Sequence, residues 1–249
     1  MSYNIKVLLA YEGTDYLGWQ KTAAGPSIEG ELEPQLQCLL GHPIRLQAAS
    51  RTDAGVHAEG QVVNFRVESL RYSLRRLQLS LNQLLPSSIR VLEIEEAPLC
   101  FHPTLDAKGK EYRYLIDNGP VALPRQRHYS WHQPFPLGID QMRQAAALLI
   151  GTNDYYALCN RSHKQKYRDT IRSLEAIELL VHPERQVELR IRGSSFLYKM
   201  VRNIAGLLVS VGLGKKGAEE IPRLLASGDR TLAGVTAPAA GLTLHRVFY

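Results

Sequence analysis

The sequence SLEAIELLVHPERQVELRIR, residues 173–192, predicts two paired β-strands. Apolar and polar side chains alternate along Val187–Arg192, which is the period of a strand with one buried face. Ser173–Val181 has the composition of a second strand, and His182–Gln186 is the turn between them. Two strands joined by a short turn run antiparallel, so this stretch predicts an antiparallel sheet.

The flanking sequence continues this mixture of strands and helices. Further strands are predicted at Tyr3–Ala10, Ile44–Ala49, Gly60–Val67, Ile89–Glu96, Lys110–Ile116 and Leu242–Tyr249. Helices are predicted after the N-cap residue Ser27 as far as Leu40, and at Ser73–Leu85, Ile139–Ile150, Ser195–Gly212 and Ala218–Ser227. Pro34 predicts a kink or a late start in the first helix, because an interior proline costs about 3 kcal/mol. Hairpin-like order favours an α+β fold with mostly antiparallel sheets over a doubly wound parallel sheet.

Composition indicates a globular chain of one or two domains. Its 249 residues are 45% hydrophobic and 22% charged, close to globular averages. A boundary near Phe101–Asp106 predicts domains at 1–105 and 106–249.

The longest stretch without Lys, Arg, Asp or Glu is Thr231–His245, which Pro238 interrupts, so no membrane span is expected. Three widely spaced cysteines indicate a reducing cytoplasm rather than a thiol-rich metal site.

The positive charge is concentrated in the second half of the chain. Residues 1–100 carry 9 basic and 11 acidic side chains, whereas residues 101–249 carry 21 basic and 13 acidic ones. Of the 30 basic residues, 21 are arginine, whose planar guanidinium suits phosphate recognition. The densest cluster, Arg161–Arg172, is either a solvated loop or a surface that follows a phosphate backbone. This distribution indicates a polyanionic partner such as nucleic acid, although solubility alone would also explain it.

The segment Ser50–Ala58 gathers polar side chains into a short turn. Asp53 has three interpretations: it braces the turn, it pairs with Arg51, or it is a catalytic carboxylate. His57 follows Asp53 by four residues, but the strand predicted next argues against a helical metal site. The sequence has no motif typical of nucleotide cofactors or serine hydrolases.

Two later segments contain further candidate residues. Tyr112 and Tyr114 share one face of a predicted strand, where they pack in the core or form a platform for base stacking. Arg202 and Asn203 lie off the apolar stripe of the predicted helix at Ser195–Gly212. An arginine there is ordinarily solvated, unless its guanidinium reaches a carboxylate such as that of Asp53.

Together these segments resemble the bacterial tRNA pseudouridine synthase A family over nearly the whole chain. Arg51–Ala58 (RTDAGVHA) is similar to the catalytic signature of that family, and Tyr11–Gln20 (YEGTDYLGWQ) to its opening loop. Later blocks match in order at Phe101–Pro103, Glu111–Tyr114, Asp169–Arg172, Phe196–Asn203 and Gly241–Leu244. Ser50 departs from the pattern, because a glycine is expected before Arg51.

The resemblance implies an isomerase that converts uridine to pseudouridine in the anticodon stem-loop of tRNA, at tRNA positions 38–40. It implies two similar domains, each a mostly antiparallel sheet with helices, with the active-site cleft between them. Asp53 would be the catalytic carboxylate, Arg51 would orient RNA or the carboxylate, Tyr112 would pack against the target base, and Arg202 would pair with Asp53. A cytoplasmic homodimer that binds tRNA and needs neither cofactor nor metal is expected. A non-catalytic tRNA-binding protein, or a synthase with another target uridine, is the alternative.

Overall fold

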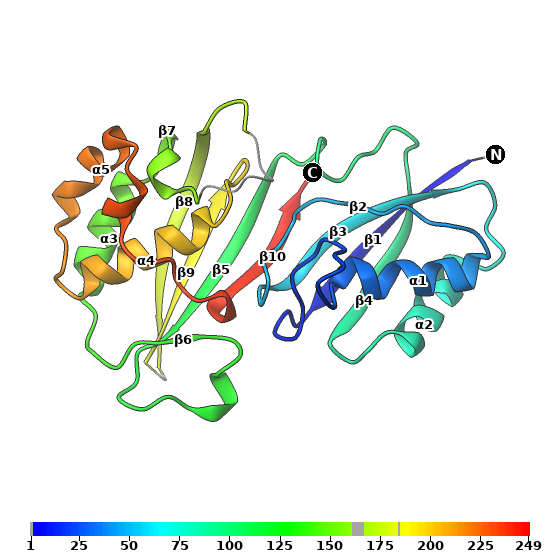
Figure 1. Cartoon of the computed structure of the whole chain (residues 1–249), viewed down its shortest axis with the longest axis horizontal. Helices are drawn as coiled ribbons and strands as arrows, with labels where there is room; N and C mark the ends of the chain where they lie inside the picture. The colour runs from blue at the N-terminus through cyan, green and yellow to red at the C-terminus, as the bar shows by residue number, and fades with distance from the viewer. Residues whose placement is uncertain (1, 161–166, 184) are drawn as a thin grey trace. The chain divides into compact units, whose positions relative to one another are not determined.

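The computed structural model describes residues 2–160, 167–183 and 185–249. The chain divides into two compact units (Figure 1). Unit 1 comprises the chain up to Lys108 together with Thr243–Tyr249, and unit 2 comprises Gly109–Leu242. Both units combine strands and helices, as the sequence predicts for an α+β fold.

The sheet of unit 1 has the strand order β4-β1-β3-β10. Its strands are β1 (Tyr3–Tyr11), β2 (Gln47–Ala48), β3 (His57–Val67), β4 (Ile89–Ala97) and β10 (Leu242–Phe248). The strands β3 and β4 run antiparallel to β1, and β2 runs antiparallel to β3. In contrast, β10 is parallel to β3, with Thr243 opposite His57. The strand predicted at Ile44–Ala49 is shorter in the structure, where β2 comprises two residues.

Two helices of unit 1, α1 (Ile28–Leu40) and α2 (Leu74–Leu84), lie side by side (Figure 1). The Oγ atom of Ser27 accepts a hydrogen bond from the Gly30 N–H at 3.2 Å, which confirms the predicted N-cap. A late start caused by Pro34 is wrong, because the helix begins directly after Ser27 and continues through the proline. Four apolar side chains at a spacing of four residues are buried and hold this helix in place: Ile28, Leu32, Leu36 and Leu40.

The sheet of unit 2 has the strand order β5-β9-β8-β7. Its strands are β5 (Gly109–Asp117), β6 (Trp131–His132), β7 (Gly151–Asp154), β8 (Ile171–His182) and β9 (Gln186–Gly193). The predicted hairpin is confirmed, since β8 and β9 pair antiparallel with Val181 opposite Val187. The short strand β6 runs parallel to β5. Apart from β6, this sheet is antiparallel.

In the described part of unit 2, the α-helices are α3 (Ile139–Leu148), α4 (Met200–Gly212) and α5 (Ile221–Ser227). Short 3-10 helices lie between the longer elements, at Pro124–Gln126, Tyr156–Leu158, Ala218–Glu220, Arg230–Ala233 and Ala239–Gly241. The helices α3 and α4 contact each other and pack on strands of the sheet. The helix α3 packs on β8, and α4 packs on β5.

The predicted start of the long helix at Ser195 is wrong, because α4 begins at Met200. Lys199 has a φ of 59°, a left-handed conformation that a helix cannot contain. Hydrogen bonds hold the segment before it in an irregular course: the Tyr198 N–H donates to Tyr167 Oη at 2.7 Å, and the Asn160 N–H donates to the Tyr198 carbonyl at 3.1 Å. Long-range contacts therefore override the apolar periodicity that extends into this segment.

The final strand joins unit 1 although the chain reaches it after all of unit 2. Beyond the β3–β10 pairing, the Lys108 N–H donates to the Phe248 carbonyl at 2.8 Å. The Tyr249 hydroxyl donates to the Pro103 carbonyl at 2.9 Å. The change of charge near residue 105 predicts a single division of the chain, with residues 106–249 in one domain. It carries no information about the return of the last strand to unit 1.

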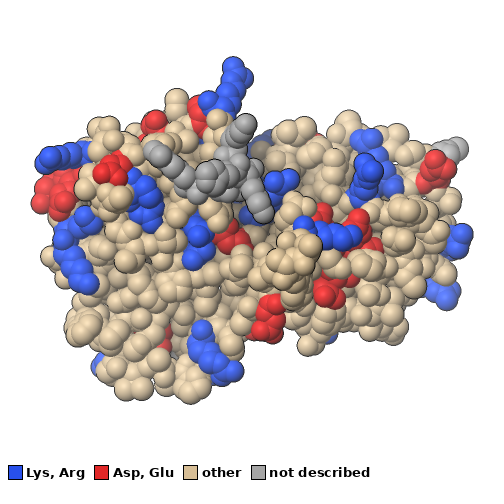
Figure 2. All heavy atoms as spheres, in the orientation of Figure 1, with Lys and Arg blue, Asp and Glu red and all other residues tan. Residues whose placement is uncertain are grey.

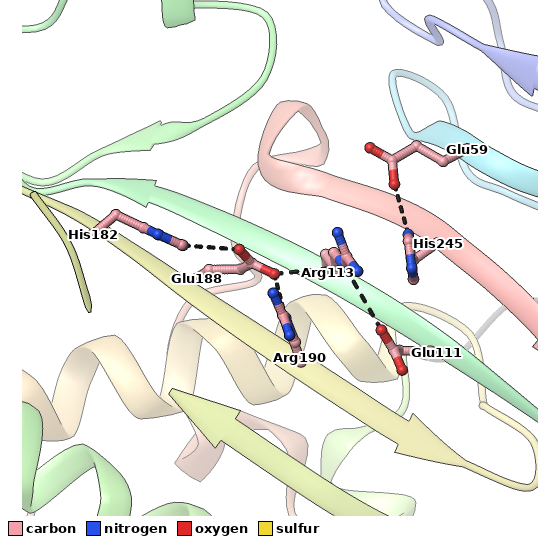
Figure 3. A network of polar contacts seen from close by, with 7 residues as sticks. All are labelled: Glu59, Glu111, Arg113, His182, Glu188, Arg190 and His245. Carbon is pink, nitrogen blue, oxygen red and sulfur yellow. Dashed lines mark hydrogen bonds and ion pairs between the residues drawn. The ribbon is translucent and has the colours of Figure 1, made fainter. Parts of the chain in front are cut away.

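Several arginines on the strands of unit 2 are paired with carboxylates (Figure 3). Glu188 receives contacts from Arg190 at 2.6 Å, from His182 at 2.9 Å and from Arg113 at 3.5 Å. Burial opposes ionisation of Glu188, but the hydrogen bonds from Arg190 and His182 outweigh it and lower the pKa of this carboxyl group. Figure 2 likewise shows basic and acidic side chains intermingled on the face in view. These arginines therefore add little to the basic surplus available to a polyanion.

We predict that Glu188→Gln lowers stability at neutral pH by at most about 1 kcal/mol, because the contacts are partly exposed. A depressed folded-state pKa means that the contribution is present above the ordinary glutamate pKa of 4.5 and is lost as the pH falls through the lower pKa of the folded state. Thermal unfolding of both proteins from pH 7 to pH 3 should show the difference in Tm shrinking below pH 4.5.

The matched control is Glu96→Gln, which changes an exposed carboxylate on β4. It should leave Tm nearly unchanged at every pH. A Glu188→Gln difference that stays constant down to pH 3 would contradict the ion-pair explanation.

Candidate active site

The loop that carries Asp53 connects β2 to β3 and is hydrogen-bonded along its length to the loop that follows β1. The Trp19 N–H donates to the Thr52 carbonyl at 3.1 Å, and the Gly55 N–H donates to the Tyr16 carbonyl at 3.2 Å. These bonds flank Asp53 on both sides in the sequence. The two loops, Tyr11–Gln20 and Ser50–Ala58, therefore form one structural unit.

Two glycines allow these loops to approach each other. A Cβ atom on Gly13 would lie 2.0 Å from the Val56 carbonyl oxygen, and one on Gly18 would lie 2.5 Å from the Thr52 carbonyl oxygen. Gly18 also has a φ of +96°, which side-chain-bearing residues rarely adopt. The glycines of the YEGTDYLGWQ segment are thus required by the position of the Asp53 loop.

A buried polar cluster anchors the base of the Asp53 loop. The Tyr11 hydroxyl and the Thr52 hydroxyl are 2.8 Å apart, and Gln61 Nε2 donates to Tyr11 Oη at 3.3 Å. The Gln61 amide also exchanges two hydrogen bonds with the main chain of Ser50, at 2.7 and 3.2 Å. Gln61 is fully buried, so loss of any of these partners would leave a desolvated polar group.

Asp53 lies at the turn of this loop and is partly exposed. Its carbonyl accepts a hydrogen bond from the Val56 N–H at 3.1 Å, and Gly55 has a φ of +77°. The turn is therefore closed by main-chain atoms and a left-handed glycine. Arg51 precedes it and is exposed.

His57 supports the loop from the first position of β3. Its Nδ1 atom accepts a hydrogen bond from the Gly13 N–H at 3.1 Å, and the side chain is buried. An accepting Nδ1 carries no proton, so the imidazole is neutral with its proton on Nε2. Within the described ranges, no group of three His, Cys, Asp or Glu side chains is placed to hold a metal ion.

Tyr112 and Tyr114 belong to unit 2 and share the inner face of β5. The Tyr112 ring packs edge-to-face on Phe196, with centroids 5.1 Å apart. Tyr114 is completely buried, its hydroxyl donates to the Pro238 carbonyl at 2.9 Å, and burial raises its pKa. Tyr114 is thus a core residue, whereas Tyr112 retains a small exposed fraction of 7%.

Arg202 lies in the first turn of α4. Its Nε–H donates to the Ala237 carbonyl at 2.7 Å, and the Ala237 N–H donates to the Arg202 carbonyl at 3.1 Å. The first bond orients the guanidinium plane, and the second ties the Ala237 main chain to α4. Asp53 belongs to unit 1 and Arg202 to unit 2, so their ion pair stays a prediction.

Sequence reasoning misplaced one residue near these candidates and missed two. Asn203, predicted to lie off the apolar stripe, is completely buried, and Arg230 Nη2 donates a hydrogen bond to it. Lys110 shares a strand face with Tyr112, and burial lowers the pKa of its amine to about 8. A polar residue inside an apolar helix was a signal for Asn203, but no local pattern indicates burial of Lys110 or Arg230.

The basic cluster Arg161–Arg172 is described in part, since residues 161–166 lie outside the described residues. Arg172 donates to Asp169 Oδ1 at 3.2 Å and packs over the Tyr167 ring, with its guanidinium carbon 5.6 Å from the centroid. Whether this cluster follows a phosphate backbone stays a prediction.

The model of the tRNA pseudouridine synthase family matches residues 8–105 and 145–249, which include both loops and α4. The chain belongs to the tRNA pseudouridine synthase family. As a member of this family it is an isomerase of tRNA modification.

Individual relatives match over almost their whole length. The tRNA pseudouridine synthase A 2 of Protochlamydia amoebophila (strain UWE25) is 52% identical over 246 residues, which cover 99% of this chain and 94% of that protein. The tRNA pseudouridine synthase A of Geotalea uraniireducens (strain Rf4) is 42% identical over 245 residues, covering 98% and 99%. The corresponding protein of Brevibacillus brevis (strain 47 / JCM 6285 / NBRC 100599) is 41% identical over 245 residues, covering 98% of this chain and 99% of that protein.

Among the helices of the described chain, none has the length and hydropathy that a membrane-spanning segment needs.

We predict that Gly18→Ala destabilises this synthase by about 1–3 kcal/mol more than Gly214→Ala. Both glycines have positive φ, but a Cβ on Gly214 would meet nothing within 4 Å, whereas one on Gly18 would collide with main-chain atoms of Thr52 and Asp53. Urea unfolding of the two variants and the parent measures the difference. Equal destabilisation would show that backbone conformation alone, and not contact with the Asp53 loop, requires glycine at position 18.

Proposed function

We propose that this chain isomerises uridine to pseudouridine in the anticodon stem-loop of tRNA, at tRNA positions 38–40, with Asp53 as the catalytic carboxylate. The observation that carries the proposal is the rigid, doubly anchored turn that presents Asp53 within a segment matched by the family. Catalytic groups need such fixed placement, since small displacements from the productive geometry cost large factors in rate. Arg51, Tyr112 and Arg202 are the proposed substrate-binding residues.

The reaction needs a carboxylate and no change in oxidation state. The bond between N1 of uracil and C1′ breaks, the base rotates, and a bond forms between C5 and C1′. C5 then loses its proton and N1 gains one, so atoms and electrons balance without water or a cofactor. Asp53 would attack C1′ as a nucleophile, and the resulting C1′–O bond would break as C5 bonds to C1′. Alternatively, Asp53 would remove the C2′ proton to give a glycal intermediate and return it to C2′ as C5 bonds to C1′. Both routes use the ionised carboxylate.

Binding of the target uridine requires it to leave the helical stack, which costs a few kcal/mol. The edge of Tyr112 that remains exposed is suited to recover part of this cost by packing against the base. The guanidiniums of Arg51 and Arg202 suit the phosphates or the carboxylate. The basic excess of residues 101–249 supports RNA binding that weakens as salt is raised.

The biological setting of the proposed enzyme follows from the resemblance. We propose a cytoplasmic homodimer that binds tRNA and uses neither metal nor organic cofactor. All three cysteines are free thiols in the structure, which fits a reducing compartment. The proposed catalytic loop lies in residues 1–105, and residues 106–249 supply most of the basic charge.

We predict that the protein releases tritium from tRNA that contains uridine labelled at C5, and that Asp53→Asn lowers this rate about a hundredfold or more. The substitution removes the nucleophile or base and keeps the size of the side chain, so tRNA affinity should change little. The matched control is Asp140→Asn, an exposed carboxylate on α3 that pairs with Arg143, and it should keep full activity. A protein that binds tRNA well but releases no tritium would instead be a non-catalytic tRNA-binding protein.

The target site is tested by mapping pseudouridines in tRNA from cells with and without the protein. We predict that pseudouridine is lost at tRNA positions 38–40 and that the wild-type chain restores it, whereas the Asp53→Asn chain does not. Loss at other positions alone would contradict the proposed target and indicate a synthase for another uridine.

A further inference from the structure

A network of neutral acceptors surrounds the guanidinium of Arg230 in unit 2. Its Nε donates to Asn160 Oδ1 at 3.2 Å, and its Nη1 donates to the Gly234 carbonyl at 2.8 Å. Its Nη2 donates to Asn203 Oδ1 at 2.7 Å and to Thr236 Oγ1 at 2.6 Å. Burial lowers the pKa of Arg230, and among the ion pairs of the described residues none involves it. The side chain therefore serves as a multiple hydrogen-bond donor rather than as half of a salt bridge.

Asn203 is the centre of this network. Its Oδ1 accepts from Arg230 and from the Thr236 hydroxyl, the latter at 2.7 Å. Its Nδ2 donates to the Leu158 carbonyl at 2.7 Å and to Asn160 Oδ1 at 2.8 Å. All four hydrogen-bonding positions of this buried amide are used. A network satisfied in this way has one geometry, which fixes the first turn of α4.

The network also fixes the segment that orients Arg202. Arg230 binds this segment at Gly234 and at Thr236, and the next residue is Ala237, which exchanges two hydrogen bonds with Arg202. Close packing reinforces the arrangement, because a Cβ on Gly206 of α4 would lie 1.9 Å from the Val235 carbonyl oxygen. Arg230 is thus linked to Arg202 in two ways: through Asn203, the next residue of α4, and through the segment that leads to Ala237.

We propose that Arg230 is a positioning residue for Arg202. It holds the 234–237 segment and Asn203 so that the Arg202 guanidinium is oriented before tRNA binds. The inference rests on the proposed function, in which the Arg202 guanidinium binds the substrate or the Asp53 carboxylate. Arginine suits the role because its planar fork reaches several acceptors at fixed angles, which a lysine ammonium group cannot reproduce.

The test is a double-mutant cycle with Arg230→Gln and Arg202→Lys, measured as kcat and KM for tRNA and as Tm. In the parent, Arg230→Gln should lower kcat about tenfold and change KM less than twofold, because orientation rather than affinity is lost. In the Arg202→Lys background the same change should cost less than twofold, because the side chain that Arg230 orients is already gone. Compared with Arg230→Gln, the Arg230→Lys variant should regain more of the parent's Tm than of the parent's kcat.

Two further variants keep the result interpretable if Arg230→Gln folds poorly. Thr236→Val removes one hydroxyl from the network and should show the same dependence on Arg202 with a smaller loss of kcat. Arg223→Gln changes an exposed arginine on α5 and should leave kcat unchanged. Normal kcat in Arg230→Gln and Thr236→Val, or equal losses in both backgrounds, would overturn the inference.

The single variants separate this inference from the proposed function. If Arg202→Lys keeps full activity, the proposed role of Arg202 fails and the inference fails with it. If Arg202→Lys loses activity while the cycle is additive, the proposed function stands and the positioning role of Arg230 is overturned.

Discussion

The position of Asp53 depends on two main-chain segments that approach each other more closely than any Cβ would allow. Gly13 and Gly18 remove that obstacle, and main-chain hydrogen bonds then join the loop after β1 to the Asp53 turn. The buried hydrogen bonds of Gln61 to Tyr11 and to the Ser50 carbonyl hold the base of the Asp53 loop in place. Because the contacts involve peptide groups, they are insensitive to most side-chain changes and highly sensitive to changes at the two glycines. The Asp53 carboxylate is therefore carried by a loop whose main chain is fixed by hydrogen bonds.

Unit 2 positions its candidate residues by a different physical means. Arg202 is oriented by a carbonyl group, and that carbonyl belongs to a segment held by the side chains of Arg230 and Asn203. A buried hydrogen-bond network of this kind gives one geometry when it is complete and loses it when one member is removed. The main-chain contacts at Gly13 and Gly18 would fail by steric collision, whereas the Arg230 network would fail by leaving a polar group unsatisfied.

Much of this structure follows from local sequence, and the rest does not for identifiable reasons. The β8–β9 hairpin and the Ser27 cap follow from alternation and from side-chain chemistry within a few residues. The start of α4 does not, because the left-handed Lys199 depends on contacts with distant residues. Among the candidate residues, Asp53 and Arg51 stand out as a cluster of reactive types in a turn, and Tyr112 and Arg202 gain meaning from the family resemblance. Arg230 has no local signal, since its partners are scattered from Asn160 to Thr236.

The pairing of β10 with β3 makes unit 1 discontinuous in sequence, with all of unit 2 inserted between β4 and β10. During synthesis the ribosome therefore completes unit 2 before it supplies the strand that extends the sheet beside the Asp53 loop. Until then β3 has an unprotected edge next to His57, where it can pair with other chains. The sheet of unit 1 is therefore completed only after the whole of unit 2 has been synthesised.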